Sequence, residues 1–195
     1  MSIEELVKIK AFGDEETNMK VLLAIHCAPI LKGSKVANIL TVTKSEFAGL
    51  GAMLEGTGIS YCFLKTKGEK AILYLYRRNE LETYLQQKEI VDFLKLYGYM
   101  EYSVNGILRR LSERICLYNS GETEFPHEIG IFLGYPLMDV KGFIENEGKN
   151  FVFSGYWKVY HNVPKTMRLF LRYDREREMV LEEVSLGKSI QEIAI

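Results

Sequence analysis

Residues 59–77, ISYCFLKTKGEKAILYLYR, form two runs rich in Ile, Leu, Tyr and Phe that are joined by a polar segment at residues 66–70. Branched and aromatic residues favour strands, and a short polar connection that contains glycine favours reversal of the chain. This stretch therefore predicts a β-hairpin, with strands at residues 59–65 and 71–77, as the centre of the fold.

The segment before the hairpin predicts a helix, a strand and a second helix. Apolar residues follow a polar start over residues 14–25, and Pro29 is expected to end this helix because the residue before a proline disfavours the helical region. Residues 37–42, ANILTV, are typical of a short buried strand. Thr43 and Glu46 match a capping box, which predicts a helix that runs up to the Gly-Thr-Gly turn before the hairpin.

The segment after the hairpin is mostly helical in pattern, with glycine and proline at its breaks. The predicted helices span residues 80–97, with a break near Gln87, and then 104–117, 126–133, 136–146 and 162–184. One further strand is predicted at residues 156–161. The pattern as a whole predicts an α+β single domain over residues 1–195, with a mostly antiparallel sheet of roughly four strands and roughly six to eight helices packed on it.

The composition excludes several classes of partner and compartment. The net charge is −1, which provides no positive field for nucleic acid, and residues 21–25 are far short of the roughly 20 apolar residues that span a membrane. The cysteines, Cys27, Cys62 and Cys116, are odd in number and widely spaced, which is typical of a reducing compartment. We expect a cytoplasmic protein that binds neither nucleic acid nor membranes.

Three motifs with known chemistry are incomplete. Residues 49–54 lack the third glycine of a dinucleotide fingerprint, and Glu182 stands where a phosphate-binding loop ending at Ser189 needs its first glycine. The last residues therefore indicate a charged tail. His127 and Glu128 begin a zinc-protease motif, but Ile131 takes the place of its second histidine.

Residues 125–150, FPHEIGIFLGYPLMDVKGFIENEGKN, are followed by GYWKVY at 155–160, and HCAPILKGSKVANIL lies at 26–40. These stretches resemble the domain-of-unknown-function family thirty-seven ninety-three, an uncharacterised family of bacterial proteins. The resemblance covers nearly the whole chain, although Val36 stands where the family pattern has proline. It implies no activity, substrate or catalytic residue.

Two polar pairs at the ends of predicted helices are the candidate site. His26 and Cys27 follow one helix, whereas His127 and Glu128 lie in the first turn of another. If the fold brings these ends together, the four residues offer ligands for zinc or iron. Alternatively, Cys27 is a nucleophile with His127 or His26 as its base. If these residues serve only the fold, Cys27 is a small buried hydrophobic residue and the Glu128 carboxylate complements the helix dipole.

Other candidate residues are cationic or aromatic. Arg77 and Arg78, at the end of a strand, are candidates for holding an anionic ligand. Aromatic residues that can stack on a flat cofactor, or else pack in the core or at an interface, are Tyr97, Tyr99, Tyr102, Tyr156, Trp157 and Tyr160.

Three functions remain open from the sequence. The first is an accessory protein of metal or redox metabolism that binds a small molecule or a metal. The second is a cysteine-dependent enzyme that uses Cys27. The third is an interaction module that docks a partner protein or a second copy of this chain in a homo-oligomer.

Overall fold

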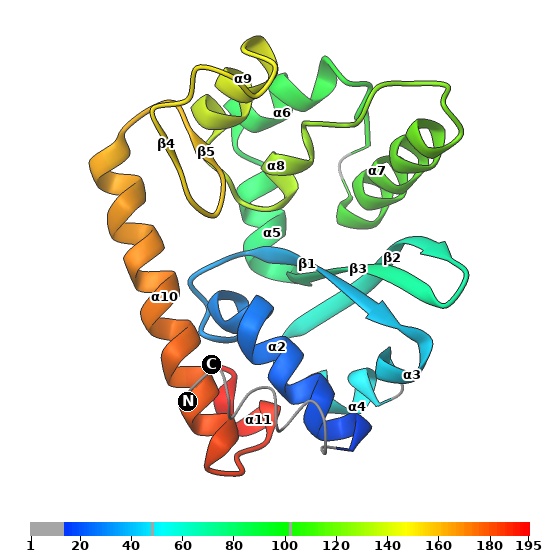
Figure 1. Cartoon of the computed structure of the whole chain (residues 1–195). Helices are drawn as coiled ribbons and strands as arrows, with labels where there is room; N and C mark the ends of the chain where they lie inside the picture. Colours follow the sequence, from blue (N-terminus) through cyan, green and yellow to red (C-terminus); the bar gives the residue numbers. More distant parts are fainter. Residues whose placement is uncertain (1–13, 48, 102) are drawn as a thin grey trace. The chain divides into compact units, whose positions relative to one another are not determined.

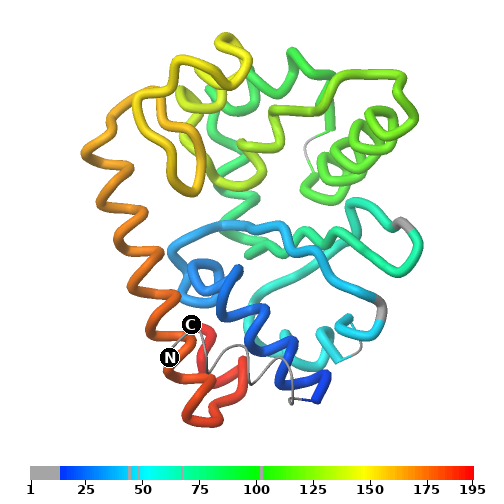
Figure 2. Tube along the Cα trace, in the orientation of Figure 1, coloured from blue at the N-terminus to red at the C-terminus, as the bar shows by residue number. Residues whose placement is uncertain are grey.

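The computed structural model describes residues 14–195 except residues 48 and 102 (Figures 1 and 2). The chain divides into two compact units, which are described separately. Unit 1 comprises Met1–Arg77 and Arg172–Ile195, and unit 2 comprises Arg78–Leu171. Helix α10 (Val163–Ser185) contributes its first residues to unit 2 and the rest to unit 1. The expectation of one domain over the whole chain stays a prediction.

The sheet of unit 1 contains the predicted hairpin. Strands β1 (Ala37–Thr43), β2 (Ile59–Lys67) and β3 (Lys70–Arg77) are antiparallel in the order β1-β3-β2 (Figure 1). Leu40 lies opposite Leu73, and both side chains are buried in the core of this unit. Because alternate residues of a strand face the same side, this register gives the sheet one continuous apolar face.

Helix α2 (Glu15–Leu31) contributes to the same core and continues past Pro29, so the expectation that Pro29 ends it is wrong. Proline removes one amide donor, which is a limited loss in the last turn of a helix. Ile30 and Leu31 follow the proline and are fully buried, and this packing stabilises the extra turn. The helix ends two residues before Gly33, which has a φ of +68°.

The helix predicted after β1 is interrupted. The capping box is present, because the Thr43 backbone N–H donates to Glu46 Oε2 across 2.7 Å. However, the helix that it begins, α3, covers only Lys44–Phe47, and α4 covers Leu50–Leu54. Gly49 separates the two with a φ of +90°, which a helix cannot contain.

The C-terminal segment is not the charged tail that the sequence indicated. It forms a short helix, α11 (Ile190–Ile193), whose first residue and Ile193 are buried in the core of unit 1. Ser189 and Glu192 form a capping box at its start. The free energy gained by burying Ile190 and Ile193 is therefore enough to fold this segment, although charged residues surround them.

Unit 2 consists of short helices and a small hairpin. The helices are α5 (Arg78–Leu85), α6 (Lys88–Lys95), α7 (Val104–Asn119), α8 (Ile129–Phe132), α9 (Leu137–Glu145) and the start of α10. The predicted break near Gln87 is confirmed, because this residue is the N-cap of α6. No helix within the described part of the chain is long and apolar enough to span a membrane.

The last predicted strand is much shorter than expected. It is reduced to β5 (Lys158–Val159), which pairs with β4 (Phe153–Ser154) in a sheet of its own. The backbone N–H groups of Tyr160 and His161 each donate to Asp139 Oδ1 across 2.9 Å. These two donors would bond to a neighbouring strand if β5 extended further. The α+β class is confirmed, with the strands divided between two sheets.

Candidate functional site

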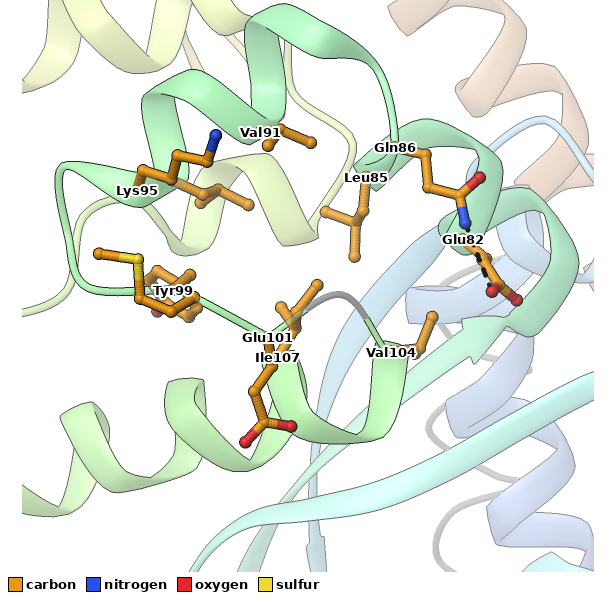
Figure 3. Close-up of a pocket in the computed structure, with 11 residues that line it drawn as sticks. Glu82, Leu85, Gln86, Val91, Lys95, Tyr99, Glu101, Val104 and Ile107 are labelled. Atoms are coloured by element: carbon orange, nitrogen blue, oxygen red, sulfur yellow. Dashed lines mark hydrogen bonds between the residues drawn. The ribbon is translucent and has the colours of Figure 1, made fainter.

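An apolar groove lies in unit 2 where α5, α6 and α7 converge (Figure 3). Its cavity volume is about 30 Å³, well below that of usual small-molecule sites, so a bound molecule would have to move the flexible side chains that line the groove. The described residues that line it are Glu82, Leu85, Gln86, Val91, Leu94, Lys95, Tyr99, Met100, Glu101, Val104 and Ile107.

The helices place apolar side chains toward the groove and polar side chains at its rim. Leu85 ends α5, Val91 lies in α6, and Val104 and Ile107 occupy the first turn of α7 (Figure 3). The Ser103 side chain caps α7 by accepting a hydrogen bond from the Gly106 backbone N–H. This cap fixes the start of α7, and therefore the position of two groove residues.

Tyr99 forms one wall of the groove and connects it to a buried charge. Its hydroxyl donates to Glu128 Oε1 across 2.9 Å, and the Arg114 guanidinium donates to the same oxygen. Glu128 is fully buried, and its Oε2 has no hydrogen-bond partner among the described residues. Burial and the neighbouring Glu128 carboxylate raise the pKa of Tyr99, so the hydroxyl stays protonated and acts as a donor.

The first predicted pair, His26 and Cys27, belongs to unit 1 and lies within α2 rather than after it. Cys27 is fully buried, and burial raises the pKa of its thiol to about 11. Asn38 and Lys35 act in the opposite direction but do not overcome the burial. A thiol in this setting is protonated at neutral pH, which does not favour a nucleophile.

The second predicted pair, His127 and Glu128, belongs to unit 2. The expected helix start at residue 126 is wrong, because α8 begins at Ile129 and the pair lies in the turn before it. The His127 ring packs beside Phe125 and Phe143, with centroid distances of 5.2 and 5.0 Å. Among residues 14–195, apart from the two undescribed positions, no group of three or more His, Cys, Asp or Glu could hold a metal ion.

The two candidate arginines occupy different environments. Arg77 is buried, and its guanidinium donates to the backbone oxygens of Ile30, Leu31 and Ile195, which joins the C-terminal segment to α2. Arg78 is exposed, and its Nη1 donates to Asn105 Oδ1 across 3.3 Å.

The aromatic candidates separate into distinct clusters. Trp157 is buried between Tyr135 and Phe170, at centroid distances of 4.6 and 4.5 Å, and Tyr156 is partly exposed beside Phe170. Tyr97 stacks under Arg114, with the guanidinium carbon 5.7 Å from its ring centroid. Tyr102 lies outside the described residues.

Sequence reasoning identified Tyr99 but missed the residues that form the groove with it. Leu85, Val91, Val104 and Ile107 belong to helices that were predicted correctly as helices. The available signal was their place on the apolar faces of these helices, which indicates burial and does not distinguish a core from a groove.

Comparison with known proteins gives one match. A family model described as "Protein of unknown function (DUF3793)" matches residues 23–194. No curated protein matches the chain, and no solved structure matches it.

Proposed function

Since the chain belongs to the family described as "Protein of unknown function (DUF3793)", whose description states no activity, we propose a function from its own side chains: unit 2 binds a small apolar molecule in the groove between α5, α6 and α7. The observation that carries the proposal is the groove itself. Small-molecule sites are concave, mostly apolar and bordered by a few polar groups, and the groove has each of these properties.

The chemistry of the lining supports binding rather than turnover. The Tyr99 hydroxyl is committed to Glu128, and the raised pKa of Tyr99 prevents it from serving as a base near neutral pH. At the rim, Gln86 Nε2 lies 3.5 Å from Glu82 Oε1, and Lys95 Nζ lies 3.7 Å from Asp92 Oδ1. Both contacts are long, so the rim groups interact only weakly, while the apolar side chains between them supply contact area.

The proposal also places the protein in the reducing cytoplasm, with a small molecule rather than nucleic acid as its partner. The support is the state of the described cysteines, which are all free, and the near-zero net charge.

The test is a titration of the 15N,13C-labelled protein with 1-octanol, followed by NMR. We expect saturable shifts in the methyl groups of Leu85, Val104 and Ile107. Val91→Phe places a ring in the groove and should weaken octanol binding at least tenfold.

The matched control is Val152→Phe, which adds the same ring at a valine that is 69% exposed elsewhere in unit 2. This variant should bind octanol as the unmodified protein does. An absence of saturable shifts in the groove, or equal binding by Val91→Phe, would contradict the proposed function.

A further inference from the structure

A second, more polar groove adjoins the apolar one. Its described lining includes Gly98, Arg109, Arg110 and Glu113. Tyr99, Met100, Glu101 and Ile107 line both grooves, so a single ligand can extend from one into the other. The apolar groove would hold the apolar part of the ligand, and the polar groove would hold its polar group.

Arg110 is the residue in the polar groove with an unused donor. Its Nε is buried and has no hydrogen-bond partner among the described residues. Its Nη1 contacts Glu113 Oε2 at 3.4 Å, which is long for an ion pair, and the Glu113 side chain is 52% exposed. Such a pair contributes little to stability, so the guanidinium retains most of its capacity for another carboxylate.

The neighbouring arginines of α7 are engaged more closely. Arg109 donates to Glu101 at the edge of the same groove, and Arg114 donates to the buried Glu128. Gly98, which has a φ of +79°, packs beside Arg110, and a Cβ at that position would lie 3.3 Å from Arg110 Nη2. A larger residue at position 98 would crowd the guanidinium.

We propose that the ligand of unit 2 is an apolar carboxylate, with its chain in the apolar groove and its carboxylate on the guanidinium of Arg110. This inference rests on the proposed function and adds the chemical class of the ligand. Planar guanidinium groups bind carboxylates through two parallel N–H donors, and Arg110 Nε is one such donor. Glu113 competes with the ligand for the guanidinium and turns toward solvent when the ligand binds.

The experiment compares octanoate with 1-octanol, which has the same chain and no charge, by NMR titration at pH 7. We expect octanoate to bind about tenfold more tightly to the unmodified protein, which is the scale of a charge-assisted hydrogen bond. Arg110→Gln should abolish this preference by lowering the affinity for octanoate to that for octanol. Arg168→Gln, which removes the same charge at an exposed position of unit 2, should retain it.

A second variant tests the competition directly. Glu113→Gln should raise the affinity for octanoate two- to threefold and leave the affinity for octanol unchanged, a gain that misfolding would not produce. Equal binding of the two probes to the unmodified protein, with no effect of Arg110→Gln, would overturn the inference and leave the proposed function standing. Binding of neither probe would overturn both.

Discussion

Tyr99 and Glu128 lie 29 residues apart in the sequence, and in unit 2 the tyrosine hydroxyl donates to the buried carboxylate across 2.9 Å. The Tyr99 ring also packs 5.3 Å from the Phe132 ring in α8. One side chain therefore forms a wall of the groove, satisfies an interior charge and contacts the short helix that follows this charge. Changes at Tyr99 should affect stability and ligand binding together.

Tyr99→Phe should lower the free energy of unfolding by about 2 kcal/mol, because Glu128 then keeps only Arg114 as a partner for the same oxygen. Urea unfolding can be followed by the fluorescence of Trp157, the single tryptophan of the chain, which reports on unit 2. Tyr118→Phe is the control, since Tyr118 is 44% exposed, and it should change little. Equal losses in the two variants would show that the bond to Glu128 contributes nothing.

Asp139→Ala should destabilise unit 2 by about 3 kcal/mol, because it leaves three donors without their acceptor. These donors are Trp157 Nε1, at 2.8 Å, and the backbone N–H groups of Tyr160 and His161. The same urea experiment applies, and Asp92→Ala, an exposed aspartate of the same unit, should stay within about 0.5 kcal/mol of the unmodified protein. A loss at residue 139 no larger than this would contradict the role assigned to it.

Lys35 should make stability depend on pH. Burial lowers its pKa from 10.5 to about 8, so between these values the unfolded chain binds more protons than the folded chain, and stability rises with pH. The free-energy cost of burying charged Lys35 therefore grows as pH falls from 10.5, and it is complete below about pH 8. Burial raises the pKa of Cys27 from 9.0 to about 11, which has the opposite effect above pH 9.

The test compares the protein with Lys35→Met by urea unfolding and circular dichroism at pH 7, 8 and 9. The stability of the protein relative to the variant should rise by about 1 kcal/mol over this range. Lys165→Met removes an exposed lysine and should give a difference that is constant with pH. A constant difference for Lys35→Met as well would show that Lys35 keeps its ordinary pKa.

The three cysteines should react with iodoacetamide in the order of their exposure. Cys116 is exposed, Cys62 is intermediate and Cys27 is buried, and burial raises the pKa of both Cys62 and Cys27 to about 11. At pH 7, peptide mass spectrometry should show alkylation of Cys116 first and of Cys27 last. Preferential labelling of Cys27 would revive the cysteine-dependent enzyme as a function.

Local features of this fold were predictable because neighbouring residues decide them. The branched and aromatic runs within residues 59–77 give the hairpin, and Thr43 and Glu46 form their capping box. Each of these depends on side chains a few residues apart. Glycines at 49 and 134 also act locally, through a positive φ.

The candidate site was less predictable because it combines distant residues. A cysteine next to a histidine suggests chemistry, but the burial of Cys27 depends on the strands and helices packed around it. Leu85, Val91 and Ile107 are apolar residues on three helices, and nothing in their local pattern states that a groove lies between them.

The sequence by itself determined the family, the α+β class, the hairpin and most helix boundaries, because periodicity and capping act over a few residues. Only the tertiary structure decided that α2 continues through Pro29, that Ile190 and Ile193 pack into a core, and that Glu128 lies buried behind Tyr99. The physical reason is the same in each case. Burial free energy and long-range hydrogen bonds depend on which segments meet, and local propensity is too small to oppose them.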